Sequence, residues 1–246
     1  MSHPIQVNYK AWGLGSQPNT ISTPIDEKII KKNVNAIEKI FSVVKLHCSS
    51  TVSVNYFQGN GNPDKELLLF RFNELPAKEC ELGGEHISIL MDPMDHKIFG
   101  LMDLRITASK KVYTTPAAAL KTAISFLKNA ASDLIFSTTS LPEMPKHTTQ
   151  SEEKITFNDH PKIGLLELHW IGQHSEFIKN KNELLEIVGM KVKFYHRERN
   201  LWLWVIVNQN NKVICYERDV FWNFDQFRRD TQMWLHDHWL IAQGLI

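Results

Sequence analysis

The sequence predicts an α+β fold of two units, each a helix packed on a short antiparallel meander sheet. Helical patterns open with a Thr-Pro pair at Thr23 and again at Thr115. Between and after them, several runs alternate apolar with polar residues, as half-buried strands do. A Ser/Thr/Pro-rich segment separates the two sets of patterns. We therefore expect an irregular N-terminal arm over 1–21, a first unit over 22–136, a linker over 137–153 and a second unit over 154–246.

The first unit starts with a helix in which Thr23 is the N-cap and Pro24 the first helical residue. Apolar residues recur at helical spacing from there to about Cys48. An Ala-rich helix with one apolar stripe is expected over 116–134. The strands expected between these helices cover 51–57, 66–73, 86–92 and about 97–105.

The second unit is expected to contain five strands and two helices. A helix near 176–188 would end at Gly189, which suits the position just after a helix. A longer helix is expected over 224–243. The predicted strands cover 154–158, 163–170, 190–198, 201–207 and 212–218.

The last three strands have a pattern regular enough to predict a register. Residues 190–197 alternate apolar with polar side chains, which indicates one buried and one wet face. If Arg199-Asn200 is a two-residue turn, Phe194 pairs with Val205 and apolar residues meet at each step. A second turn then pairs Val205 with Ile214. Phe194 and Val205 are therefore expected to be buried neighbours.

The opposite side of the same strands, here called the aromatic face, is the candidate binding surface. In the predicted register Arg197 lies beside Trp202, and Trp202 lies beside Glu217. A cation over an indole, flanked by a carboxylate, can form the floor of a ligand site. Packing against a helix or a second subunit is the alternative use of such a face. The expected ligand-binding residues are Tyr195, Arg197, Trp202, Trp204, Glu217 and Arg218.

No sequence motif indicates a cofactor, a metal or a familiar reaction. HExxH, Gly-rich phosphate loops and GxSxG elbows are absent. On a helix, His236 and His238 would point roughly 200° apart, so they are not expected to share an ion. Cys215 is expected to be a buried, inert thiol. If the protein is an enzyme, its acid–base groups would come from His196, Glu217, Asp230 and His238.

Composition excludes several classes of partner. The formal net charge is +1, so bulk electrostatics gives no reason to expect a nucleic-acid or membrane partner. There is no signal-peptide pattern at the N-terminus and no apolar run of spanning length. The three cysteines form no CxxC pair, which suits a reducing compartment. We therefore expect a cytoplasmic protein.

A weak internal repeat suggests a family. The segment from Ile87 through Asp92 to Phe99 is similar to that from Leu203 through Asn208 to Ile214. A strand, turn and strand followed by a helix resembles PepSY-type or cystatin-like modules, here as two tandem copies. The resemblance implies a regulatory or inhibitory binding unit.

Two functions are kept open by these observations. The first is a non-catalytic binding or regulatory module that recognises a small molecule or a protein partner through the aromatic face, with a homodimer as one form. The second is a small-molecule enzyme without a familiar motif. An enzyme needs titratable groups that converge in a concave pocket, whereas a binding module can present a flat apolar patch.

Overall fold

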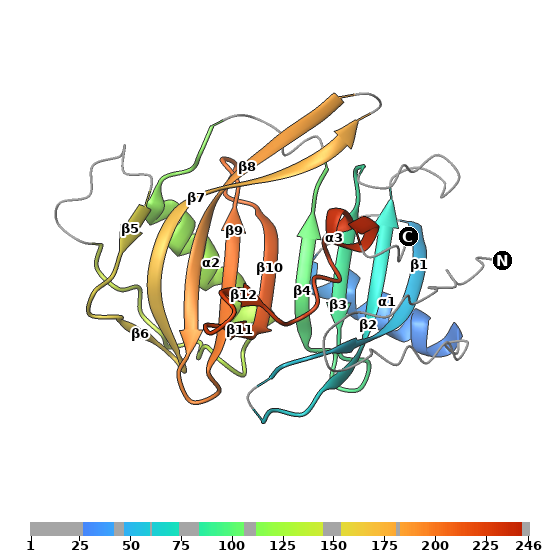
Figure 1. Cartoon of the computed structure of the whole chain (residues 1–246), viewed down its shortest axis with the longest axis horizontal. Helices are drawn as coiled ribbons and strands as arrows, with labels where there is room; N and C mark the ends of the chain where they lie inside the picture. The colour runs from blue at the N-terminus through green and yellow to red at the C-terminus, as the bar shows by residue number, and fades with distance from the viewer. Residues whose placement is uncertain are drawn as a thin grey trace.

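A computed structural model describes residues 27–41, 47–59, 61–73, 84–105, 112–144, 154–180 and 183–242. Within them the chain is mostly β and forms one ten-stranded antiparallel sheet (Figure 1). The expected fold class, two separate helix-on-sheet units, is therefore wrong. Strands from both halves of the chain join because β4 (Ile98–Asp103) pairs with β10 (Val213–Val220).

The sheet has a simple order on each side of this β4–β10 seam. Along one side lie β3 (Ile87–Met91), β2 (Lys65–Asn73) and β1 (His47–Tyr56). Along the other lie β9 (Leu201–Val207), β8 (Glu183–His196), β7 (Leu166–Asn180) and β5 (Lys154–Thr156), with β6 (Lys162–Ile163) also paired to β7. The two segments of the internal repeat thus form the pairs β3–β4 and β9–β10.

The two faces of the sheet carry different elements. One side, the helix face, is covered by α1 (Glu27–Phe41) and α2 (Pro116–Ala130) (Figure 1). The other, the front face, carries α3 (Asp237–Ala242) and the small hairpin of β11 (Trp222–Asn223) and β12 (Arg228–Arg229). A separate apolar core fills each side. None of the described helices is long and apolar enough to cross a membrane.

The ends of the two long helices fit the sequence only in part. The start of α2 is as expected, because the Thr115 hydroxyl accepts a hydrogen bond from the Ala118 N–H and Pro116 is the first helical residue. The cap expected at Thr23 and the arm over 1–21 lie outside the described residues. The first helix was expected to reach Cys48, but β1 already begins at His47. Of the expected linker, 137–144 is described and has no regular secondary structure.

The predicted register of β8 and β9 is displaced by two residues. The turn takes four residues instead of two, so Phe194 lies opposite Leu203 and Val205 lies opposite Val192. A shift by an even number leaves every side chain on its predicted face, and Phe194 and Val205 are both fully buried on the helix face. The pairing of Val205 with Ile214 is also wrong. Val213 already pairs with Val207, one residue from the predicted register, and a bulge in β10 adds a second residue, so Val205 lies opposite Tyr216.

The helix expected over 176–188 is a strand hairpin. Residues 176–180 form the far end of β7 and residues 183–188 the start of β8 (Figure 1), and 181–182 lie outside the described residues. Ile178 and Ile187 are fully buried in the front-face core, and this tertiary packing overrides the local helical pattern. Gly189 is needed for close packing within the sheet, because a Cβ there would lie 2.5 Å from Cγ2 of Ile206.

The helix expected over 224–243 is also wrong for most of its length. The Asn223 side chain accepts hydrogen bonds from the N–H groups of Asp225 and Gln226, which favours a turn over a helix. Phe227 has a positive φ of 51°. Within the described residues 224–242, α3 at the end is the only helix. His236 precedes it, so the helical angle expected between His236 and His238 does not apply.

Candidate functional site

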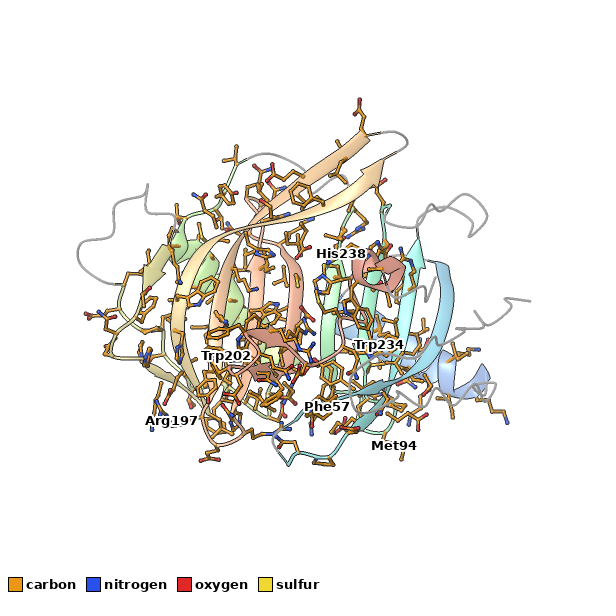
Figure 2. The ribbon with its side chains drawn as sticks, viewed as in Figure 1. Phe57, Met94, Arg197, Trp202, Trp234 and His238 are labelled. Carbon is orange, nitrogen blue, oxygen red and sulfur yellow. The ribbon has the colours of Figure 1, made fainter. Side chains whose placement is uncertain are left out.

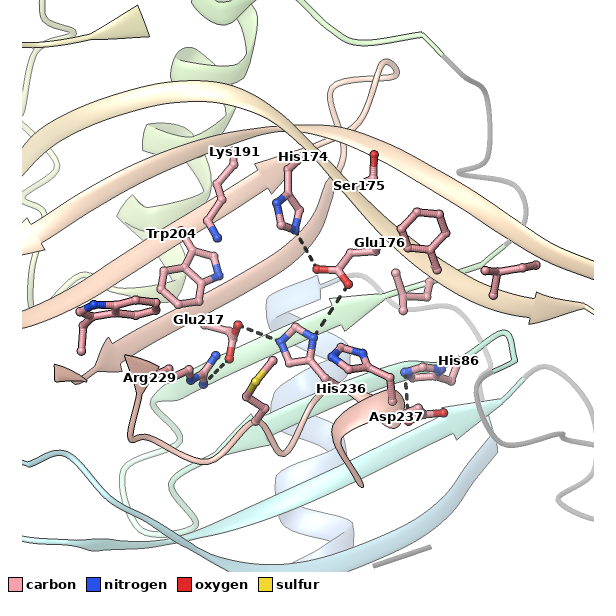
Figure 3. Close-up of a pocket in the computed structure, with 16 residues that line it drawn as sticks. His86, His174, Ser175, Glu176, Lys191, Trp204, Glu217, Arg229, His236 and Asp237 are labelled. Carbon is pink, nitrogen blue, oxygen red and sulfur yellow. Dashed lines mark hydrogen bonds and ion pairs between the residues drawn. The ribbon is translucent and has the colours of Figure 1, made fainter. Parts of the chain in front are cut away.

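A pocket of about 760 Å³ lies on the front face, across the β4–β10 seam (Figure 3). Its walls come from the β7–β8 hairpin, the inner strands β8 to β10, and the segment from Trp222 to His238. His86 before β3 and Leu104 after β4 complete it from the first half of the chain. The lining is mostly apolar, and the size suits a small molecule.

Three neighbouring strands supply the floor. Trp204 of β9 lies directly opposite Glu217 of β10. On the other side of Trp204, Lys191 of β8 reaches over the indole, with Nζ 4.1 Å from the ring centroid. The alternation of side chains along each strand therefore places a cation, an indole and a carboxylate next to one another.

Glu217 is the most deeply buried carboxylate of the site, with a relative exposure of 2%. Its oxygens accept hydrogen bonds from Arg229 Nη2 at 2.6 Å and from His236 Nε2 at 3.0 Å. Burial opposes ionisation, but Arg229 and His236 outweigh it and hold the Glu217 pKa well below its usual range. Because an ionised carboxylate can only accept, Nε2 of His236 carries a proton.

A second carboxylate extends this chain of contacts along the pocket wall (Figure 3). Glu176 Oε2 lies 3.9 Å from His236 Nδ1, and Glu176 Oε1 lies 2.9 Å from His174 Nε2. Burial raises the Glu176 pKa, but the hydrogen bond from His174 and the charge of His236 lower it more, so the net shift is downward. His236 therefore lies between two ionised carboxylates.

The remaining charges of the wall are also held in place. Arg229 donates from Nε to the Thr231 carbonyl at 2.8 Å, which fixes the guanidinium that holds Glu217. Asp237 accepts a hydrogen bond from Arg71 Nη2 at 2.6 Å. Thus Glu176, Glu217 and Asp237, the carboxylates that line the pocket, each have a basic partner.

Lys191 is different. Within the described part of the chain, its ammonium makes no hydrogen bond or ion pair, and its close contact is the Trp204 ring. Burial lowers the Lys191 pKa, and the carboxylates of Glu217 and Glu176 only partly offset that effect. The pocket thus contains a partly desolvated amine with no ion-pair partner among the residues that the structure describes.

The structure places three of the expected site residues at this pocket. Trp204 and Glu217 belong to its floor, and His238 lies at its exposed edge. Burial, followed by the charge of His236, lowers the pKa of His238. The aromatic face therefore contributes to the pocket with only part of its length.

The other aromatic-face residues form a separate group near the β8–β9 turn, away from His238 (Figure 2). Tyr195 packs on Trp202 with a centroid distance of 4.7 Å. Lys193 lies over Trp202, with Nζ 4.1 Å from the ring centroid, where Arg197 was expected. Arg197 instead pairs with Glu167 and is 69% exposed. The two-residue register shift puts Tyr195, instead of Arg197, opposite Trp202.

Three further expected residues also lie outside the pocket lining. Arg218 binds Asp133, just after α2, through two hydrogen bonds. His196 accepts a hydrogen bond from the Arg199 N–H in the β8–β9 turn. Asp230 accepts from Asn223 within the small hairpin. The structure therefore separates His196 and Asp230 from Glu217 and His238.

Sequence reasoning missed most of the polar wall. Glu176 was assigned to a helix and Arg229 to another, so neither was expected beside the sheet. A strand assignment would have placed His174 and Glu176 on one side, because residues two apart in a strand share a face. Lys191 was assigned to a wet face, and no local signal indicates that the β7–β8 hairpin and the C-terminal segment bury it.

Cys215 is a free, buried thiol whose pKa is raised well above its usual value by burial. Its cross-strand partner is Ile206. Among the described residues, no group of three His, Cys, Asp or Glu side chains is arranged to hold a metal ion.

Comparison with known proteins gives no relative: no family model, curated protein or solved structure matches this chain. The resemblance to PepSY-type or cystatin-like modules stays a prediction. The geometry of the site is therefore the basis for a functional conclusion.

Proposed function

We propose that this protein binds a small molecule in the front-face pocket, with an apolar body against Trp204 and a hydrogen-bond acceptor against Lys191. The observation that carries the proposal is the unequal pairing of charges. The carboxylates of the pocket already have basic partners, whereas the Lys191 ammonium has no described ion pair or hydrogen bond. A ligand oxygen would supply the missing acceptor.

Because Lys191 is partly buried, a ligand acceptor beside its ammonium would stabilise the complex. A partly desolvated amine without a hydrogen bond costs free energy, and a carboxylate or carbonyl oxygen would offset that cost. A charge-assisted hydrogen bond is also stronger than a neutral one. Lys191 would therefore select ligands with an oxygen at one end and reject those with a cation there.

The apolar lining favours a flat ligand body. Trp204 and Trp222 present indole rings to the pocket, and Phe177 and Leu184 of the β7–β8 hairpin line its side. Sites of this size and lining bind small molecules through apolar contact, with a few polar groups that fix their orientation. The size and lining of the pocket therefore favour a small-molecule ligand over a protein partner.

A small-molecule enzyme is the second candidate. His236 lies between Glu176 and Glu217, an arrangement that can hold and move a proton. Conversion of a bound ligand by the wild-type protein, lost in His236→Gln, would support it.

The proposal is tested with two probes that share a ring and differ in charge, 2-naphthoate and 2-naphthylmethylamine. Quenching of tryptophan fluorescence gives the dissociation constants. We expect the wild-type protein to bind naphthoate at least about tenfold more tightly, the equivalent of one charge-assisted hydrogen bond. Lys191→Met should abolish this preference, and its melting temperature checks that the variant is folded.

Lys193→Met is the matched control, because Lys193 lies two residues away on the same strand face but packs on Trp202 outside the pocket. It should keep the preference for naphthoate. Equal binding of both probes by the wild-type protein, or an unchanged preference in Lys191→Met, would refute the proposal.

We also propose a cytoplasmic location, which the free Cys215 thiol and the absence of a cysteine framework favour. A homodimer through the aromatic face stays a prediction.

A further inference from the structure

The environment of Lys191 suits a reactive amine as well as a hydrogen-bond donor. Its Nζ points into the pocket beside the Trp204 ring, and the His174 ring and Glu176 carboxylate point into the same space (Figure 3). Among the described residues no carboxylate lies within ion-pair distance of Nζ, so the charged amine is favoured by contact with the Trp204 ring but not by an ion pair.

We infer that Lys191 forms an imine with ligands that carry an aldehyde or ketone on an apolar, flat body. This inference rests on the proposed small-molecule function of the same pocket and names the chemical class of its ligand. An amine in a largely apolar pocket is a nucleophile when it is neutral, and this is how lysines react with carbonyl compounds in proteins.

The reaction needs no co-reactant. The Nζ lone pair forms a bond to the carbonyl carbon, the C=O π electrons move to oxygen, and that oxygen takes up a proton. Nitrogen then loses its remaining protons as the hydroxyl group leaves with one proton as water. The products are a C=N bond and one water molecule, so an aldehyde and a neutral lysine account for all atoms.

Side chains of the wall are placed to carry these protons. His174 and Glu176 share a hydrogen bond of 2.9 Å on the strand next to Lys191. Such a pair can donate a proton to the oxygen of the attacked carbonyl and accept one from nitrogen. Both would act as proton carriers and not as the nucleophile.

The charges around Lys191 permit the neutral amine to form. Burial is the main influence on its pKa, which lies below the usual value for lysine. Cys215 and Glu217 of β10 and Glu176 of β7 raise the pKa, whereas Arg229 of β12 lowers it. As pH rises, imine formation should therefore speed up at pH values below those needed for an exposed lysine.

The experiment uses 2-naphthaldehyde with sodium cyanoborohydride, which reduces an imine to a stable amine. Mass spectrometry of the digested full-length protein locates the naphthylmethyl group. We expect one group per chain, on Lys191, formed at least tenfold faster than on any other lysine. An excess of 2-naphthoate should slow this labelling, because both probes occupy one pocket.

Two variants separate chemistry from folding. Lys191→Met and Lys191→Arg should both lose the fast labelling. The arginine variant keeps a cation over the Trp204 ring. If its melting temperature is unchanged, the loss of labelling results from removal of the nucleophilic amine and not from unfolding. Lys193→Met should keep it, although the Lys193 pKa is also lowered, to about 8, by burial and by Lys191 and Lys154. Lys193 is therefore the lysine most able to compete with Lys191 for the aldehyde, and it is a stringent control.

Fast labelling of Lys193 instead of Lys191, or even labelling of all lysines, would overturn the inference. If the protein binds 2-naphthoate but is not labelled, the inference is also overturned. That result would not contradict the proposed function. Absence of both labelling and naphthoate binding would contradict the proposed function itself.

Discussion

Glu217 is the residue through which the sequence and the structure agree most closely on the site. The alternating pattern placed it beside Trp202, and the structure puts it on the same face but opposite Trp204, two residues along β9. Its partners could not be predicted, because Arg229 and His236 lie in a segment whose sequence has a helical pattern. In the structure this segment forms turns and the short β11–β12 hairpin before α3 begins. Local periodicity thus placed Glu217 on the correct face of the sheet but indicated neither its burial nor its partners Arg229 and His236.

The Glu217 carboxylate should stabilise the fold in a pH-dependent way. Its folded-state pKa lies below the usual 4.5, so the stabilisation is complete above about pH 5 and is lost as pH falls towards the folded-state pKa. Glu217→Gln should cost about 3–5 kcal/mol at pH 7, the range for removing one partner of a buried ion pair. Chemical denaturation at pH 7 and pH 4 measures both effects.

The variant should also lose less stability than the wild type between pH 7 and pH 4. Glu198→Gln, at an exposed position in the β8–β9 turn, is the control and should behave like the wild type. A loss below about 1 kcal/mol in Glu217→Gln, with the wild-type dependence on pH, would mean that this contact network contributes little.

The β7–β8 hairpin is the element that local sequence predicts worst and that the pocket depends on most. Residues 176–188 carry a mixed pattern that a short helix would also satisfy, and only pairing with the partner strand decides between the two. By contrast, β9 matches its predicted bounds, since seven consecutive residues rich in β-branched and aromatic side chains leave little choice.

Two substitutions in this hairpin should have opposite consequences. Ile187 is fully buried, so Ile187→Ala should cost about 2–5 kcal/mol of stability. Leu184 is 70% exposed and lines the pocket, so Leu184→Ala should change stability by less than about 0.5 kcal/mol and weaken naphthoate binding. Denaturation and fluorescence titration of both variants test the strand assignment. Equal destabilisation by the two changes would contradict it.

At the scale of the whole molecule, the β4–β10 seam turns two predicted units into one sheet with one front face. Its partners, for example Gly100 and Glu217, are more than a hundred residues apart, and no local pattern encodes which strands of two meanders will meet. The seam has a functional consequence. His86 and Leu104 come from the first half and Lys191 and Trp204 from the second, so the pocket exists only in the joined sheet.

The most direct test of the central claim is the dependence of 2-naphthoate affinity on pH. The claim is that Lys191, which has no ion-pair partner among the described residues, donates to the ligand's acceptor in this pocket. The bound carboxylate stabilises the charged amine and raises its pKa, so binding is tightest below the pKa of Lys191 in the free protein. Above that pKa, calorimetric titrations should show the affinity falling by up to about tenfold per pH unit. Lys191→Met should show weak binding with no such dependence. A wild-type affinity that stays constant with pH and equals that of the variant would contradict the claim.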